Sequence, residues 1–534
     1  MSGFTSHPLG VSLPPHDPHA ISVSMPTWSD VVGYEEGHPD VLTALACGYP
    51  RFFRHPLVLE LEHVLHAQLF PTDDDDATTW DEMVAPTRDV AERLRHFLLD
   101  THVKCDPDHV SVHEVHGLVQ LVRFPRSMRP SAKAFWQHSG EIVTSRHAQA
   151  LLHVLAQTQP QDHVKSSRLR LGKTDKHVAL RQRIAELYVD SGAIDQVAVY
   201  PTGMSAIFST VRLLQRFRGT ACKSILVGFP YVDTLKILSR PAWCPRGVHF
   251  FPLCGEDVMQ QVEAIVASEK VLGIWTEFPS NPLLSLPDLK RLAKCAHENG
   301  TVLIVDDTVG SYNVNPMAHG CADLVVTSLS KIFSGSGNVM AGSVVLNPSS
   351  PRAKELETLF HPDKDSYLVE PDVDALLEQS ANLAERLAKT NATTAELVHR
   401  LVAHPVVKKV YYPTQGNVKN LYDPFANVCA ATNKVAGYGP LLSILLHGGL
   451  EPTRAFYNAL TIAKGPSLGT NFTIACPYTL LAHYQELAFA ASCDVDRNLI
   501  RISIGQEDPD VIWADFEHAL GVAAQCIQST SEST

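Results

Sequence analysis

Short hydrophobic runs alternate with longer amphipathic segments through the middle of this chain. Six runs, rich in valine, isoleucine and leucine, read as buried strands: 224–228, 248–253, 271–276, 302–306, 324–327 and 342–346. Runs without a polar face predict a sheet covered on both sides, and hence a mostly parallel one. Segment 287–299 between them carries apolar residues at i, i+3, i+4 and i+7 from Leu289, and Gly300 is a natural helix stop. This alternation predicts an α/β domain with right-handed crossovers.

The flanking regions have different patterns. A helical stretch at about 370–403 precedes strand candidates at 406–412, 441–446 and 499–504, which predict a smaller terminal domain, with a polar tail that frays after 527. Residues 1–30 are rich in proline, serine and histidine and read as an extended, loosely held arm. Mixed helical patterns with an acidic loop at 73–76 follow. We therefore divide the chain into an N-terminal accessory region (1–165), a large α/β domain (166–388) and a small C-terminal α/β domain (389–534).

Composition narrows the functional classes. The chain has 534 residues, which favours two or three domains, and 45% hydrophobic and 19% charged residues, which indicates a globular protein. A net charge of −13 disfavours nucleic acid as a partner. No apolar run reaches the roughly 18–20 residues that a membrane-spanning helix needs.

Cysteine and histidine usage adds two expectations. The eleven cysteines form no CxxC pair, and Arg51 is the first basic residue, so neither a disulfide framework nor a secretory or mitochondrial leader is indicated. We expect a cytoplasmic protein. The 26 histidines include no HExxH or Cys/His knuckle, so we expect no metal site.

Polar residues follow the predicted strands, where open α/β sheets bind ligands. In Thr202-Gly-Met-Ser-Ala206, the amides of Gly203 and Met204 would form an anion site at a helix start, suited to phosphate. Asp306 ends a buried strand, where a carboxylate needs a cationic partner such as a pyridinium nitrogen. Taken alone, each feature also fits an ordinary helix start or a surface turn.

A lysine follows another buried strand, in Ser328-Leu-Ser-Lys331. Lys331 near an apolar strand end can have a lowered pKa and act as a Schiff-base nucleophile. The hydroxyl groups of Ser328 and Ser330 could bind a phosphate. A lone lysine here would usually be a snorkelling surface residue, so the prediction depends on the combination of these features.

In that combination, residues from about 180 to 520 resemble the Cys/Met-metabolism family of enzymes that depend on pyridoxal 5′-phosphate (PLP). The matching motifs stand in order: Thr202-Gly-Met-Ser-Ala206, Tyr231-Val-Asp-Thr234, Glu277-Phe-Pro-Ser-Asn-Pro282, Val305-Asp-Asp-Thr308, Ser328-Leu-Ser-Lys331, Pro466-Ser-Leu-Gly469 and Arg501-Ile-Ser-Ile-Gly-Gln-Glu507. The resemblance implies the type I, aspartate-aminotransferase-like fold: a mostly parallel large-domain sheet, a smaller C-terminal α/β domain and, here, an N-terminal extension. The long N-terminal region is similar to that of the fungal cystathionine γ-synthase group.

The resemblance also implies roles for residues. PLP would be attached to Lys331, its phosphate held by Gly203, Met204, Ser328 and Ser330, and its ring contacted by Tyr231, Asn281 and Asp306. Ser467 and Arg501 would bind the substrate α-carboxylate, while Lys331 and Tyr231 would be catalytic. A homodimer or homotetramer is implied, because family sites combine two subunits. The family has a Tyr-x-Arg motif whose arginine reaches the phosphate across the interface. Tyr49-Pro-Arg51 matches the residues of that motif better, but Arg146 lies at the more plausible position along the chain, so Arg146 is preferred over Arg51.

By the same resemblance, the expected reaction is γ-replacement on O-acetyl-L-homoserine, with cysteine as the nucleophile and cystathionine as the product. The alternative is a γ-substituting enzyme of secondary metabolism that adds a carbon or other nucleophile to make a non-proteinogenic amino acid. A lyase or sulfhydrylase, and a non-catalytic scaffold, fit less well. Two departures leave the nucleophile open: Gly335-Ser-Gly-Asn338 replaces Gly-His-Ser-Asp, and Thr470-Asn-Phe472 replaces Gly-x-Glu, so that Phe472 removes a carboxylate.

Overall fold

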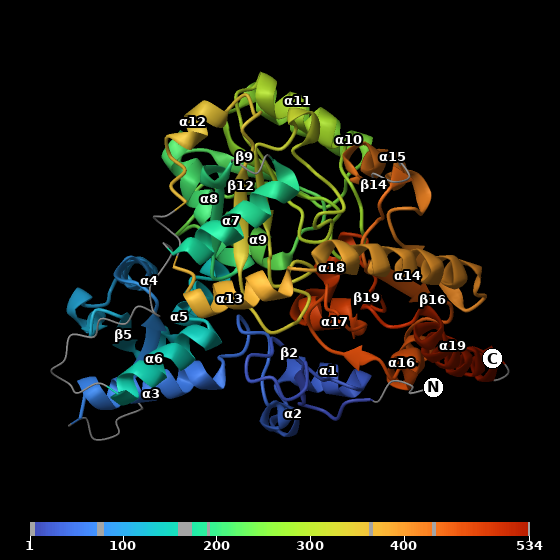
Figure 1. The fold of residues 1–534 in the computed structure, drawn as a ribbon, viewed down its shortest axis with the longest axis horizontal. Coiled ribbons are helices and arrows are strands. Elements are labelled where there is room, and N and C mark those ends of the chain that lie inside the picture. Colours follow the sequence, from blue (N-terminus) through green and yellow to red (C-terminus); the bar gives the residue numbers. More distant parts are fainter. Residues whose placement is uncertain are drawn as a thin grey trace.

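The molecule has a large α/β domain, a small C-terminal domain and an N-terminal region that contacts both (Figure 1). The computed structural model describes residues 6–71, 79–157, 174–189, 193–362, 367–429 and 434–531. The predicted acidic loop at 73–76 and the predicted boundary at 165/166 lie outside these residues. None of the described helices is long and apolar enough to cross a membrane.

A seven-stranded sheet forms the centre of the large domain. In order across the sheet, its strands are β6 (Val197–Tyr200), β12 (Gly342–Leu346), β11 (Leu324–Thr327), β10 (Leu303–Asp306), β9 (Val271–Glu277), β7 (Lys223–Val227) and β8 (Val248–Phe251). All six predicted strands are present, with ends shifted by at most two residues, and β6 is added at one edge. Only β12 runs antiparallel to its neighbours in this sheet, so the sheet is mostly parallel as predicted.

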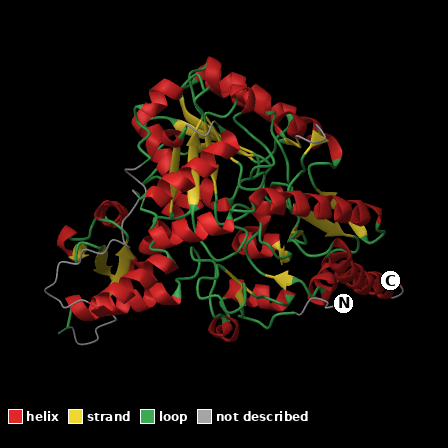
Figure 2. Ribbon diagram, in the orientation of Figure 1, coloured by secondary structure: helices red, strands yellow, loops and turns green. Residues whose placement is uncertain are grey.

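The sheet is buried on both faces because successive side chains of a strand point in opposite directions. In β10, Leu303 and Val305 join one hydrophobic cluster and Ile304 joins another. Figure 2 shows the helices that cover the strands on either side. These helices are α7 (Asp175–Tyr188), α8 (Gly203–Arg218), α9 (Val232–Ser239), α10 (Glu256–Ser268), α11 (Leu289–Glu298), α12 (Ala353–Glu357) and α13 (Glu370–Gln379).

The small domain is built on a five-stranded sheet. Its strands, in spatial order, are β13 (Val407–Tyr411), β16 (Leu441–Leu446), β19 (Ile500–Ser503), β18 (Ile474–Pro477) and β17 (Ala463–Lys464). Its helices and remaining short strands are α14 (Leu383–Ala403), α15 (Lys419–Tyr422), β14 (Val428–Cys429), β15 (Lys434–Val435), α16 (Leu450–Ala459), α17 (Tyr478–His483), α18 (Leu487–Ser492) and α19 (Pro509–Ser531). The boundary predicted at 388/389 falls inside α14. The tail predicted to fray after 527 instead continues α19 to Ser531.

The accessory region contains a sheet that the helical patterns did not predict. Three antiparallel strands lie in the order β3-β5-β4 and pack against four helices. The elements are α3 (Pro56–Leu69), β3 (Trp80–Ala85), α4 (Arg88–Thr101), β4 (Ser111–Val115), β5 (Val119–Pro125), α5 (Arg129–Ser139) and α6 (Ser145–Gln157). The edge strand β4 carries the polar residues Ser111, His113 and Glu114, which are partly or fully exposed, whereas the central strand β5 is mostly buried.

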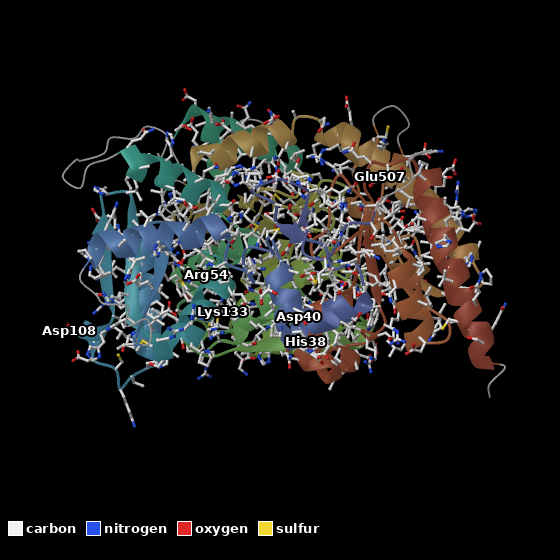
Figure 3. All side chains as sticks on the ribbon, turned by 90° about the horizontal axis from the view of Figure 1, so that it is seen from below. His38, Asp40, Arg54, Asp108, Lys133 and Glu507 are labelled. Carbon is white, nitrogen blue, oxygen red and sulfur yellow. The ribbon has the colours of Figure 1, made fainter. Side chains whose placement is uncertain are left out.

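Residues 6–55, which we call the arm, are attached to both domains. The prediction that residues 1–30 are loosely held is therefore wrong for the described residues 6–30. Its elements are β1 (Ser12–Leu13), β2 (Ser22–Val23), α1 (Trp28–Glu36) and α2 (Pro39–Ala44). The amide of Ile21 donates to the Gly337 carbonyl at 2.9 Å, and the amide of Trp28 donates to Asn458 Oδ1 at 2.8 Å. The arm thus joins both domains, and Figure 3 shows it from below, in front of them, with His38 and Asp40 at the start of α2.

Candidate active site

A cavity of about 590 Å³ lies at the carboxyl ends of the parallel strands and is lined by residues of the two domains and the arm. The cavity is lined by nine of the residues predicted from the motifs: Gly203, Met204, Tyr231, Asn281, Asp306, Ser328, Lys331, Ser467 and Arg501. They come from segments nearly 300 residues apart. The fold therefore brings the spaced motifs to one place.

Lys331 has an environment that suits an amine nucleophile. Its ammonium nitrogen Nζ donates to Ser467 Oγ at 3.1 Å and lies 4.3 Å from the centre of the Tyr49 ring. Burial lowers the pKa of Lys331, although the neighbouring Tyr49 acts in the opposite direction. A lowered pKa raises the fraction of neutral amine, which is the form that attacks an aldehyde carbon.

The start of α8 packs closely against the segment that carries Lys331. Thr202 caps the helix, since its Oγ1 accepts the Ser205 amide at 2.9 Å. A Cβ atom at Gly203 would lie only 2.9 Å from Ser328 Cβ, so this contact requires glycine. The helix N-terminus and the Ser328 hydroxyl together form a wall that suits a phosphate group.

Two carboxyl groups, those of Asp306 and Glu277, also line the cavity. Burial raises the pKa of both Asp306 and Glu277, and the proximity of Asp306 adds to the effect on Glu277, whose pKa is about 8. Within the described residues, no lysine or arginine side chain forms an ion pair with either group. A buried carboxylate without a cationic partner fits the protonated ring nitrogen of PLP.

Glu277 also organises the surrounding backbone. Its Oε2 accepts the Asn281 amide at 2.9 Å, while its Oε1 accepts the amide of Tyr231. Tyr231 stands directly before α9 and Asn281 follows β9, so one carboxyl group positions residues from two separate loops.

Arg501 is held ready to bind a carboxylate. Its Nη1 donates to Asn281 Oδ1 at 3.1 Å, and its Nη2 donates to the Ser467 carbonyl at 2.7 Å. Ser467 has a backbone φ of +101°, a strained value for a residue with a side chain. The strained turn directs the carbonyl to Arg501 and the hydroxyl to Lys331, so it links the carboxylate-binding group to the nucleophile.

Of the two candidate arginines, Arg51 lies in the cavity of its own chain. Its side chain is 2% exposed and donates to Asp233 Oδ2 at 2.9 Å and to the Tyr231 hydroxyl. Arg146 lies outside the cavity, where it donates to the Asn338 carbonyl at 2.6 Å. The prediction for Arg146 concerned a neighbouring subunit, which a single chain does not test.

Two other residues lie elsewhere than the sequence suggested. Ser330 is turned away from the cavity, because its hydroxyl accepts the Ala341 amide at 2.9 Å and ties the loop to β12. Phe472 packs with Leu13 and Ile474 rather than lining the cavity. The lost carboxylate at position 472 therefore does not leave an apolar side chain in the cavity wall.

The structure adds residues that the motifs did not assign. Tyr49 approaches Lys331, Tyr478 stacks 5.0 Å from the Arg501 guanidinium, and His483 follows at the end of α17. The match of Tyr49-Pro-Arg51 to the Tyr-x-Arg motif could have identified Tyr49 from the sequence. Nothing in the local sequence marks the other two, because aromatic and histidine residues at helix ends are common.

Comparisons with known proteins agree with this geometry. Residues 144–521 match the family described as "Cys/Met metabolism PLP-dependent enzyme", and residues 58–144 match "Fungal trans-sulfuration enzyme, N-terminal domain". The chain is 34% identical to "Cystathionine gamma-synthase-like enzyme iboG2" of Amanita muscaria, over 98% of this chain and 97% of that protein. It is 32% identical to "Cystathionine gamma-synthase" of Neurospora crassa, over 97% and 98% of the two chains.

Solved structures support the fold. A cystathionine gamma synthase from Xanthomonas oryzae pv. oryzae, solved in complex with cystathionine, matches with a TM-score of 0.56 and 22% identity, over 69% of this chain and 90% of that one. The architecture is therefore that of the type I PLP enzymes with an additional N-terminal region. The chain belongs to the Cys/Met-metabolism family of PLP-dependent enzymes and is a cystathionine γ-synthase-like member of it.

Proposed function

We propose that the chain catalyses γ-replacement on O-acetyl-L-homoserine, with cysteine as the nucleophile and cystathionine as the product. The observation that carries the proposal is the position of Arg501 beside Lys331, connected through Ser467. An α-amino acid bound by its carboxylate at Arg501 would present its amino group and Cα to Lys331. A planar guanidinium suits this task because it can donate two parallel hydrogen bonds to one carboxylate.

The residues that line the cavity fit PLP, with Lys331 for attachment, the α8 start and Ser328 for the phosphate, and Asp306 for the ring nitrogen. When bound, PLP supplies an electron sink for negative charge that develops at Cα. Lys331 would remove the proton from Cα and transfer a proton at Cβ. Tyr231 would hold the ring face, with its hydroxyl fixed by Arg51.

The outer cavity supports a second candidate. Leu42, Phe52 and Leu481 line it, and Leu42 and Phe52 are 40% and 38% exposed. This apolar part of the cavity wall would accommodate an acceptor less polar than cysteine, such as a carbon nucleophile. The second candidate is therefore a γ-substituting enzyme of secondary metabolism that makes a non-proteinogenic amino acid.

The deciding experiment incubates the purified holoenzyme with O-acetyl-L-homoserine and, separately, with L-cysteine, a 2-oxo acid, an aldehyde and an amine, and identifies products by mass. Cystathionine from cysteine is the expected result. A product from another nucleophile alone would overturn the primary proposal in favour of the second. We further propose a homodimeric or homotetrameric enzyme of the cytoplasm, which light scattering and cell fractionation would test.

A further inference from the structure

A histidine and a glutamate in the outer cavity have no role in the chemistry described so far. His483 ends α17, and Glu486 lies three residues later; both line the cavity. His483 Nδ1 lies 3.1 Å from Glu486 Oε1. A carboxylate bonded to one ring nitrogen of histidine fixes the tautomer and leaves the other nitrogen as a proton acceptor.

The other ring nitrogen, Nε2, is buried and has no hydrogen-bond partner among the described residues. His483 is only 1% exposed, and its ring is in tilted contact with the rings of Phe229 and Tyr478, whose centres lie 5.1 Å and 5.7 Å away. A buried nitrogen without a hydrogen-bond partner lowers the stability of the protein unless a bound ligand supplies the missing hydrogen bond. This nitrogen is therefore a candidate contact for a substrate.

His483 also stands at a suitable place relative to the amino-acid site. Tyr478 separates it from Arg501, whose guanidinium lies 5.0 Å from the Tyr478 ring. The arm helix α1, which packs against α17, contributes Tyr34 and Glu35 to the same lining. We call the part of the cavity lined by Tyr34, Glu35, His483 and Glu486 the outer chamber; it is continuous with the part lined by Arg501.

We propose that His483, oriented by Glu486, is the base that takes the proton from the incoming nucleophile in the outer chamber. The inference rests on the proposed γ-replacement and places the addition of the nucleophile to Cγ in this chamber. The bond from Cγ to the acetate oxygen breaks, and acetate leaves with the electron pair. The bond from the nucleophilic atom to Cγ forms, and the proton of that atom passes to His483 Nε2 and then to solvent.

The charges around His483 agree with a base that is neutral at rest. Burial lowers the pKa of His483, whereas its hydrogen bond with Glu486 opposes this shift. Lys236 also lowers this pKa and Asp233 raises it; both approach from α9. Lys133 of α5, labelled in Figure 3, also lines the cavity, and a cation there suits an acceptor that carries a carboxylate, as cysteine does.

The test compares the wild type with His483→Gln and Glu486→Gln, and with His518→Gln, an exposed histidine of α19, as the matched control. With L-cysteine, His483→Gln should form cystathionine about 100-fold more slowly, the usual size of a general-base effect. The burst of acetate released from O-acetyl-L-homoserine without cysteine should stay within about twofold. Glu486→Gln should shift the acid limb of the pH profile for cystathionine formation to lower pH, because the carboxylate raises the pKa of His483.

A series of thiols separates catalysis from structure. As the acceptor thiol becomes more acidic it needs less help from a base, so the deficit of His483→Gln should shrink. A deficit that is constant along the series, or an acetate burst that falls equally, would overturn the inference. If the wild type makes no cystathionine, the proposed function fails instead, and the variants are then compared with the nucleophile that the wild type accepts.

Discussion

At the scale of single residues, the cavity depends on groups that serve two neighbours at once. Glu277 accepts the amides of Tyr231 and Asn281, and Ser467 contacts Lys331 through its hydroxyl and Arg501 through its carbonyl. Such shared contacts fix the distance between the ring-binding and carboxylate-binding groups. Substitution of Glu277 or Ser467 should therefore disturb both groups at once, whereas substitutions of Lys331 and Arg501 themselves should have separable effects on attachment and on substrate binding.

Lys331→Ala should abolish both the visible absorption of lysine-attached PLP and cystathionine formation. The reason is that alanine has no amine for attachment or for proton transfer at Cα. Absorption spectra and product assays of the purified variant provide the measurement. Lys294→Ala, at a lysine whose side chain is 73% exposed, should behave as the wild type; an active Lys331→Ala enzyme would refute the assignment.

Arg501→Lys should weaken substrate use and leave PLP attached. Lysine carries the charge but cannot make the paired hydrogen bonds, so kcat/KM for O-acetyl-L-homoserine should fall about 10- to 100-fold. This decrease should come from a higher KM, measured under steady-state conditions, and the absorption spectrum of bound PLP should stay unchanged. Arg454→Lys, on the exposed surface, is the control, and an unchanged KM in Arg501→Lys would exclude a role in carboxylate binding.

Much of the site at this scale could be predicted because each motif couples a residue type to a strand end. Lys331, Asp306 and Arg501 stand directly after or within buried strands, and the sheet brings such positions together. The direction of a hydroxyl could not be predicted. Ser328 faces the cavity while Ser330, two residues later, bonds the Ala341 amide, and only the turn geometry decides between them.

At the scale of elements, the accessory region contains an unusual buried acid between a helix and a strand. Glu62 of α3 accepts the Val84 amide of β3 at 3.0 Å and lies 3.0 Å from Arg54. Burial raises the pKa of Glu62 to about 7, despite Arg54. The charged form is therefore disfavoured in the folded protein.

This shift predicts a pH dependence of stability. Because the folded pKa lies above the unfolded value of 4.5, the folded state binds the extra proton, and stability falls as pH rises from about 4.5 to 7. Glu62→Gln should therefore raise the free energy of unfolding at pH 8 by on the order of 1–3 kcal/mol and change it little at pH 5. Thermal unfolding at both pH values measures this, with the exposed Glu60→Gln on the same helix as control; equal effects at both pH values would contradict it.

Six of the seven strands of the large domain were predictable, whereas several elements outside it were not. Fully apolar runs such as β11 leave little choice of structure, since only a covered strand buries them. By contrast, β4 has the mixed polar and apolar sequence Ser-Val-His-Glu-Val, and β17 has only two residues. Neither sequence can be distinguished from a loop by its pattern. Their existence depends on partners elsewhere in the chain, which a local pattern does not contain.

At the scale of the whole molecule, the arm places Arg51 in the cavity of its own chain. If Arg51 acts there, co-expressing Arg51→Ala with Lys331→Ala should restore no activity, because no subunit of a mixed oligomer has both residues. Restoration to about a quarter of wild-type activity, the share of intact sites in a random dimer, would show that Arg51 acts across the interface. Light scattering confirms that oligomers of the 58.6 kDa chain are present in the mixture.

The anchoring of the arm has a consequence for how the protein is made. Trp28 of the arm bonds Asn458, a residue 430 positions further along the chain. At ordinary rates of synthesis the ribosome needs roughly 20 to 90 seconds to reach that partner. Until then the apolar residues Ile21, Val23 and Met25 have no surface to cover them. The arm is thus synthesised long before the surface that covers it, and its apolar side chains stay exposed on the growing chain during that interval.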